Sequence, residues 1–528
     1  MAAFADVLLR ALGLTGQALV LGGVAFALVV LRPLVSSQPD PRPLLGRTLG
    51  LVALGALGMA LAQSLAVLLQ LASVADEAGW PVREALRAAF FRANLVRLLA
   101  CVGVLVGCRV LRQRPAARGG WTVLVVCALV LGAGSAWLGH AAGRLERRAP
   151  LLALDALHQI GAGVWVGGLV HLMVFALRRP ERSWPAAVLQ RFSGLALAAV
   201  AILVAAGLGL SLSYVDGIRA LVGTAYGVMV LTKAVVLAGL LFLGGMNFVA
   251  VRRLVRGGGA SLLGLRRLVE VEVGLGMTAF FAAASLTSLP PAVDVVVDRA
   301  TLAEVATRFA PRWPSLTTPT IDELLASAAP ITDLRASRRP EEYAWSEYNH
   351  HVAGLFILAM GLLASLERAG WARWARHWPL LFLGLAAVLF VRNDPRAWPL
   401  GPAGFWESMA LPDVLQHRIF VLVVVAFGLF EWMVRTRRLR SPGWALVFPL
   451  CAAAAGGLLI THSHAMFNLK AEFLVEVTHT PLGLLGLFVG WTRWLELRLP
   501  PPGNRVPARL WGPGLALVGI LLLLYRER

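Results

Sequence analysis

The chain has 528 residues, of which 58% are hydrophobic and only 15% are charged. A water-soluble domain has about 25% charged residues, so this composition excludes an ordinary soluble protein. The formal net charge is +20, but it does not indicate nucleic-acid binding. The arginines lie in short segments between apolar blocks, where cytoplasmic loops of membrane proteins carry them, and we expect no nucleic-acid partner.

The apolar residues form blocks of roughly 18 to 25 residues, the length of a helix that crosses a lipid bilayer. Few blocks alternate as the strands of a membrane barrel do. We therefore predict an all-α polytopic transmembrane bundle of about fourteen helices. In chain order, the predicted helices cover 11–31, 48–74, 93–110, 121–141, 151–177, 192–214, 224–250, 269–289, 350–366, 379–391, 418–434, 443–461, 472–492 and 511–525.

The first block lacks a convincing small-residue cleavage site, so we expect it to be a retained helix. Arginine clusters fall in alternate loops, and the positive-inside rule makes these loops cytoplasmic and places the N-terminus outside. We predict an eight-helix half at 1–290, an extracytoplasmic linker at 291–346 and a six-helix half at 347–528. The linker contains no recognisable enzyme motif, and we do not expect an enzyme.

Two histidines of the first half fall toward the predicted outer face. His140 ends the fourth predicted helix, and His158 lies about two turns into the fifth. Asp155 shares a helix face with His158, so we predict that this carboxylate orients the imidazole or relays protons. The alternative for His158 is a hydrogen-bonded core residue. His171 lies roughly 20 Å deeper and is predicted to be structural.

The second half places three more histidines at the outer ends of helices. His350 and His351 open the ninth predicted helix, and His417 opens the eleventh. Neighbouring residues are about 100° apart on a helix, so at most one of the first two readily faces the core. Glu347 lies one turn before His351, and we predict that it orients a ligand or relays protons. The alternative for His417 is that it only marks the membrane interface.

The segment 461–466 reads Thr-His-Ser-His-Ala-Met and is the sharpest local signal. In an extended loop, His462, His464 and Met466 point the same way. Two imidazoles and a thioether suit copper, above all Cu(I). The alternative is a polar outer loop whose histidines touch only water or lipid headgroups.

Three ionisable residues follow one face of the thirteenth predicted helix, namely Glu472, Glu476 and His479. They are predicted to bind a cation or to pass protons. The alternative is an outer helix end with solvated acids. Lys233 lies in the middle of the seventh predicted helix, where a structural ion pair is its expected use.

Most of the ten histidines thus share one predicted membrane face: His140, His158, His350, His351, His417, His462, His464 and His479. Loop solvation alone does not favour histidine over Asp, Glu, Lys or Ser. Imidazole is the commonest metal ligand, and it suits copper among other metals. We therefore predict that these histidines are ligands of a copper ion.

Several motifs in the first half together resemble one known family. Ser135–Ala141 reads SAWLGHA, Asp155–His158 reads DALH and Gly163–Leu169 reads GVWVGGL. Arg191-Phe192-Ser193, Tyr226-Gly227, Lys233, Asn247 and Pro290-Pro291 follow in order. The segment resembles the membrane domain of the copper resistance protein D (CopD) family. This resemblance implies roles for His140 and His158 by their positions in the motifs.

The second half carries Glu347–His351, Val414–Arg418 and Thr478–Pro481, which resemble extended CopD-like proteins. The resemblance implies a multi-pass protein of the bacterial inner membrane that serves copper passage or copper tolerance. No soluble copper-binding domain is fused here, so a periplasmic copper-binding partner would be a separate protein. We predict copper uptake from the outer side into the cell.

Two other functions remain open at this stage. Paired histidines on different helices, such as His158 and His479, could hold a haem in a membrane electron carrier. A copper chaperone or assembly factor for cytochrome oxidase would bind the metal and transport nothing.

Overall fold

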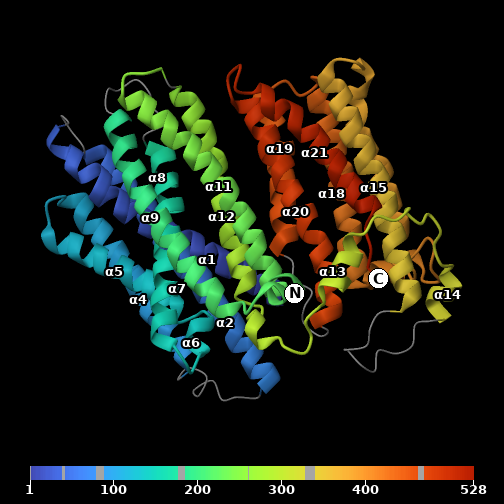
Figure 1. Ribbon diagram of the computed structural model, residues 1–528, viewed down its shortest axis with the longest axis horizontal. Helices are drawn as coiled ribbons and strands as arrows, with labels where there is room; N and C mark the ends of the chain where they lie inside the picture. The colour runs from blue at the N-terminus through green and yellow to red at the C-terminus, as the bar shows by residue number, and fades with distance from the viewer. Residues whose placement is uncertain are drawn as a thin grey trace. The chain divides into compact units, whose positions relative to one another are not determined.

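The computed structural model describes residues 2–37, 42–78, 88–175, 185–259, 261–326, 339–461 and 469–527. Within these ranges the regular structure is helical, and no strand occurs (Figure 1). Fourteen helical segments of the described chain are long and apolar enough to cross a membrane. The predicted all-α membrane bundle and its helix number are therefore confirmed, whereas the outer position of the N-terminus stays a prediction.

The chain divides into two compact units. Unit 1 comprises Met1–Leu221 and Met229–Val295, and unit 2 comprises Val222–Val228 and Val296–Arg528. Each unit is described by itself below. The predicted division into two membrane halves and a linker at 291–346 concerns domains and stays a prediction.

The helices that begin in unit 1 are mostly long single spans. In order they are α1 (Ala2–Ala25), η1 (Phe26–Leu31), η2 (Arg32–Ser37), α2 (Arg42–Ala78), α4 (Ala89–Gln113), α5 (Arg118–Ala136), α6 (His140–Gly143), α7 (Arg148–Ala162), η3 (Gly163–Gly167), α8 (Gly168–Phe175), α9 (Pro185–Tyr214), α10 (Ile218–Gly223), α12 (Leu262–Leu286) and η4 (Ala292–Asp294). Helix α11 (Ala225–Val255) starts in the segment Val222–Val228, which belongs to unit 2, and continues in unit 1.

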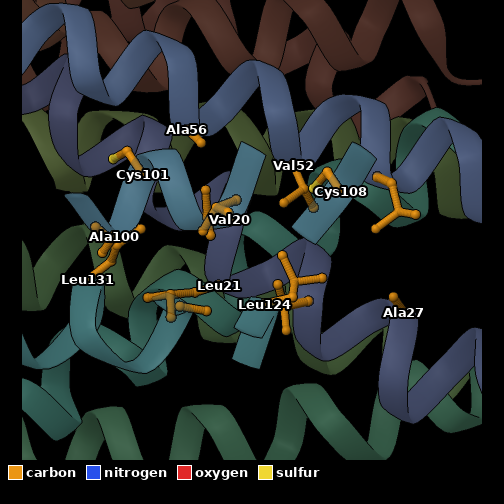
Figure 2. Close-up of a cluster of buried hydrophobic side chains, with 14 of the residues drawn as sticks. Val20, Leu21, Ala27, Val52, Ala56, Ala100, Cys101, Cys108, Leu124 and Leu131 are labelled. Carbon is orange, nitrogen blue, oxygen red and sulfur yellow. The ribbon is translucent and has the colours of Figure 1, made fainter. Parts of the chain in front are cut away.

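The main core of unit 1 joins α1, α2, α4 and α5 (Figure 2). Buried side chains from these four helices include Val20, Val52, Cys101 and Leu124. In a bilayer the lipid is as apolar as these side chains, so close packing rather than water exclusion holds such helices together. Cys101 and Cys108 thus serve as small apolar core residues.

A short π-helical turn, η3, brings the fifth span against α1. A Cβ on Gly167 would lie 1.8 Å from the Ala18 carbonyl oxygen, and a Cβ on Gly163 would lie 2.8 Å from Leu21 Cδ1. Only glycine permits this approach, as expected for two small residues one turn apart. Gly163 and Gly167 therefore serve the packing of the fifth span against α1.

Unit 2 contains α13 (Leu302–Phe309), α14 (Ile321–Ala326), α15 (Pro340–Ala369), η5 (Arg373–Leu380), α16 (Leu381–Arg392), α17 (Phe405–Ala410), α18 (Pro412–Arg435), η6 (Pro442–Leu446), α19 (Val447–Thr461), α20 (Leu469–Arg498) and α21 (Arg505–Leu523). Helix α13 begins with a capping box formed by Thr301 and Glu304. Lys470 Nζ lies 2.8 Å from Glu304 and ties α13 to α20.

An aromatic core fixes α15, α18, α20 and α21 around a buried arginine. Trp378, Phe448 and Trp511 pack together in this core, and the Arg435 guanidinium lies 4.6 Å from the Trp378 ring centroid. Arg435 also pairs at 2.7 Å with both Glu367 and Glu431. The pairing satisfies charges that would be costly alone in an apolar setting.

Candidate functional site

A chain of polar side chains crosses the inside of unit 1. Arg97 of α4 donates to Gln17 Oε1 of α1 at 3.1 Å, and the Ser135 hydroxyl of α5 donates to the same oxygen. Gln17 Nε2 lies 3.5 Å from Gln159 Oε1 of α7, and Gln159 donates to Asp155 Oδ1 at 3.1 Å. We call these five residues the unit 1 polar chain.

Sequence reasoning did not select Gln17 or Arg97. The signal was present, because each is a polar residue inside an apolar block, where such residues are rare and often functional. Both are buried in the structure. Their hydrogen bond joins α1 to α4, so the polar chain holds four helices together and leads from the core to Asp155.

Asp155 lies where the polar chain meets two further ionisable groups. Its carboxylate interacts electrostatically with Lys233 of α11 and with His140. Within the described chain, no carboxylate oxygen lies within 4.0 Å of the Lys233 ammonium. The expected ion pair of Lys233 is thus a longer-range attraction to Asp155 rather than a contact.

His158 is held by α9 rather than by Asp155. Its Nδ1 lies 3.0 Å from the Leu203 carbonyl oxygen. A carbonyl only accepts hydrogen bonds, so Nδ1 carries the proton and Nε2 keeps its lone pair. Gly207 leaves room for the ring, because a Cβ there would lie 2.9 Å from His158 Cε1. The sequence predicts that Asp155 orients the His158 imidazole, but in the structure the Leu203 carbonyl orients it.

His140 lies outside the membrane-spanning segments, at the N-terminus of α6. Its Nε2 is 3.3 Å from the Leu286 carbonyl oxygen, and its ring packs edge-on to Tyr214 with centroids 6.1 Å apart. Burial is the main cause that lowers the pKa of His140 below its usual value. The imidazole is therefore neutral near pH 7, which is the state that binds metals.

A second cluster lies within unit 2 and joins three separate elements. His350 of α15, His479 of α20 and Tyr525 beyond α21 form what we call the unit 2 histidine cluster. The His350 and Tyr525 rings stack with centroids 3.9 Å apart. The His479 centroid lies 5.8 Å from that of His350 and 5.3 Å from that of Tyr525. The cluster brings together two of the predicted ligands from distant parts of the sequence.

In both histidines of this cluster, a backbone carbonyl fixes which ring nitrogen carries the proton. His350 Nδ1 lies 2.8 Å from the Ser346 carbonyl oxygen, and His479 Nδ1 lies 2.9 Å from that of Val475. Each Nδ1 therefore carries its proton, and each Nε2 keeps a lone pair. Two imidazole nitrogens on one ion, each at about 2.0 Å, place the ring centroids roughly 6 Å apart. The observed separation fits this requirement.

His351 lies beside the cluster but is occupied differently. Its Nδ1 is 2.8 Å from the Ser315 carbonyl oxygen, and its Nε2 is 3.0 Å from the Tyr525 carbonyl oxygen. Neither nitrogen is turned toward a metal in this arrangement. Glu347 accepts a hydrogen bond at 3.0 Å from the backbone amide of Glu527. Both residues fasten the C-terminal residues to α15.

The remaining predicted residues fall into three situations. His417 is exposed, and its Nδ1 lies 2.7 Å from the Asp413 carbonyl oxygen of its own helix. Glu472 and Glu476 lie on α20 before His479, and Glu476 is buried. The predicted ligands His462, His464 and Met466 lie outside the described residues. Among the residues that are described, no group of three or more His, Cys, Asp or Glu side chains is arranged to hold a metal.

Comparison with known proteins adds an independent line of evidence. Residues 186–286 match the family profile described as "Copper resistance protein D". The match covers α9, α10, α11 and α12. The chain is 30% identical over 182 residues to "Copper transport protein CutJ" of Bacillus subtilis (strain 168), which is 34% of this chain and 32% of that relative. No solved structure matches the chain.

Proposed function

We propose that this chain, whose residues 186–286 place it in the copper resistance protein D family, transports copper ions across a bacterial inner membrane. The observation that carries the proposal is this family region, supported by the partial similarity to a protein named for copper transport. The chain spans about a third of that relative, so activity, direction and partners are inferred for this chain.

The arrangement of unit 1 supports a transport role for the family region. Helix α9 supplies the Leu203 carbonyl that sets the tautomer of His158, and α11 supplies Lys233 near Asp155. His158 thus offers Nε2 from inside a spanning segment, between helices α7 and α9. Ionisable groups at membrane depth mark ion pathways more often than they serve packing.

We infer that donors at the outer face capture copper and that His158 is a copper ligand within a spanning segment. The capture groups are His350 and His479, together with His462, His464 and Met466. The predicted topology places all of them on the extracytoplasmic side, so the proposed transport runs inward. A separate periplasmic copper-binding protein would deliver the ion to these groups. Copper is the cargo here, and two imidazoles with a thioether suit its reduced form.

Copper uptake into liposomes tests the proposal. Purified protein is reconstituted around a trapped copper-sensitive dye, and copper is added outside with a reductant. The wild type should quench the dye, whereas His158→Ala combined with His350→Ala and His479→Ala should lower the initial rate at least about tenfold, the scale of a lost metal-site group.

The matched control for this experiment is His377→Ala. This exposed histidine of η5 is not one of the predicted ligands and accepts a hydrogen bond from Trp432 Nε1, so its loss should leave the rate unchanged. If the triple variant transports as fast as the wild type, the proposed role of these histidines is rejected. If the wild type binds copper but quenches no trapped dye, the protein is a copper chaperone rather than a transporter.

The haem alternative has a geometric objection within unit 2. The Tyr525 ring stacks on His350 at 3.9 Å and lies beside His479, so the space that a porphyrin would need next to these histidines is filled. The absorption spectrum of the purified protein should therefore lack a Soret band.

A further inference from the structure

A cavity of about 270 Å³ lies within unit 1, among η3, α8, α9, α11 and α12. Its wall is mostly apolar and includes Trp165, Phe192 and Phe248. Only three polar side chains line it among the described residues, namely Ser193, Asn247 and Glu272. An ionisable carboxyl at the wall of an apolar, membrane-embedded cavity is costly, so its presence calls for a function.

Glu272 and Asn247 form a pair across two helices. Glu272 of α12 is 1% exposed and Asn247 of α11 is 9% exposed. Asn247 Nδ2 donates a hydrogen bond to Glu272 Oε1. The other amide atom, Asn247 Oδ1, is buried and has no hydrogen-bond partner in the described structure. One donor of the amide is therefore used, and its acceptor remains available.

Among the described residues Glu272 has no ion pair, and Asn247 is the hydrogen-bond partner of its carboxyl. Helix α8 carries one histidine, His171, and its Nε2 lies 3.0 Å from the Leu19 carbonyl oxygen of α1. The residues that α9 and η3 present to the cavity carry no charge. A bound proton is the remaining way to remove the cost of the buried charge.

The pair also lies within a membrane-spanning segment. Glu272 is five residues beyond Arg267 on α12, which corresponds to about 7 Å along the helix, so it follows the charged residues of the first turns and lies inside the span Leu262–Leu286. Close to the carboxyl, Gly244 has no side chain, and a Cβ there would lie 3.7 Å from Glu272 Oε2.

We propose that Glu272 is a proton-binding site whose proton exchanges through this cavity and is coupled to copper movement. The coupling rests on the proposed transport function, whereas the proton site itself does not. In the ionised state, Glu272 accepts from Asn247 Nδ2. In the neutral state, the carboxylic O–H donates to Asn247 Oδ1 once the amide has turned. One O–H bond forms or breaks, and the proton passes to or from water.

A membrane-soluble carbodiimide tests the proton site without copper. Dicyclohexylcarbodiimide enters apolar cavities and reacts with a protonated carboxyl, so that the whole reagent adds to the acid and nothing is released. The intact folded protein in detergent should take up the reagent at Glu272, as peptide mass spectrometry would locate. The labelling rate should fall as pH rises, and Glu272→Gln should abolish labelling of this peptide.

The matched control is Glu270→Gln, two residues away on the same helix. Glu270 pairs with Arg267 at 2.5 Å and with Arg266 at 3.5 Å, so two guanidinium groups occupy its carboxyl group and it should not react. Wild-type protein that stays unlabelled at Glu272 across pH 5 to 9 would overturn the proton site. Labelling at both glutamates would overturn the inference that Glu272, and not Glu270, is the proton-binding carboxyl.

The coupling between protons and copper is tested in the same dye-loaded liposome assay, with a pH gradient imposed across the membrane. The wild-type rate should change at least about threefold with the gradient, while Glu272→Gln should lose that response and Glu272→Asp should keep part of it. If the wild type moves no copper at all, the transport proposal fails while the labelling result stands. If Glu272→Gln transports with an unaltered gradient response, the coupling is rejected.

Discussion

At the scale of single residues, backbone carbonyls decide what each histidine can do. The Nδ1 atoms of His158, His350 and His479 each bond to a main-chain oxygen, which leaves Nε2 as the metal-binding atom. His351 instead uses both nitrogens on carbonyls. Two neighbouring histidines on one helix therefore have different uses. His350 is a candidate metal ligand, whereas His351 holds the C-terminal residues against α15.

His140 is expected to make stability depend on pH in a defined direction. Its pKa in the folded protein lies below the usual 6.5, so the unfolded chain binds its proton more readily. The stabilising contribution is complete above about pH 6.5, and it is lost as the pH falls from there through the lower folded pKa. We predict that His140→Gln, which can still donate to the Leu286 carbonyl, narrows the difference in melting temperature between pH 7.5 and pH 5.

The measurement is thermal unfolding in detergent, compared between wild type and variant at each pH. The comparison with the wild type removes the contribution of other titrating groups. An equal pH dependence in both proteins would contradict the assignment of this shift to His140.

At the scale of elements, the spans pack through glycines and through paired charges. The contact of η3 with α1 depends on Gly167, which faces the Ala18 carbonyl. This contact positions the fifth span, whose first part carries Asp155 and His158 and whose π-turn carries Trp165 at the cavity wall. Packing at one crossing thus controls the geometry of both the polar chain and the cavity.

Substituting Gly167 by alanine should disrupt this crossing. The added methyl would overlap the Ala18 carbonyl oxygen, and overpacking of this kind typically costs about 1–3 kcal/mol. We predict a lower melting temperature in detergent for Gly167→Ala. Gly194→Ala is the control, because a Cβ at Gly194 meets no atom within 4 Å. Equal melting temperatures for the two variants would show that η3 and α1 are not packed as described.

At the scale of the whole molecule, the side of the membrane that each loop faces determines the direction of transport. The arginine-rich loops predict the orientation, and the proposed inward transport assumes it. The loop between α11 and α12 is predicted to be cytoplasmic, and the loop between α6 and α7 is predicted to be extracytoplasmic.

Two single cysteines test this orientation. Leu145, between α6 and α7, is 98% exposed, and Gly259, before α12, has open space where a Cβ would be. We predict that a membrane-impermeant maleimide labels Leu145→Cys in intact cells, and labels Gly259→Cys only after the cells are opened. The native chain is the control, because Cys451 is exposed and Cys127 is half-buried, so any label on the native cysteines must be subtracted. The reverse labelling pattern would invert the proposed direction.

The sequence by itself determined the class of protein and the number of spans, and its motifs pointed to the copper resistance protein D profile that matches residues 186–286. Hydrocarbon imposes a local rule, in which about 20 apolar residues form one helix, so span number can be counted along the chain. The motifs from Ser135 to Pro291 indicated the family for a similar reason, since they are local patterns. Which side chains meet is not a local property.

Only the tertiary structure decided that His350 meets His479, that a carbonyl rather than Asp155 orients His158, and that Glu272 faces a cavity. These outcomes depend on how each helix is rotated and how closely its neighbours approach. In a bilayer, both are set by small residues and by polar pairs between distant segments. Helical periodicity specifies a face of one helix, but it does not specify the partner of that face.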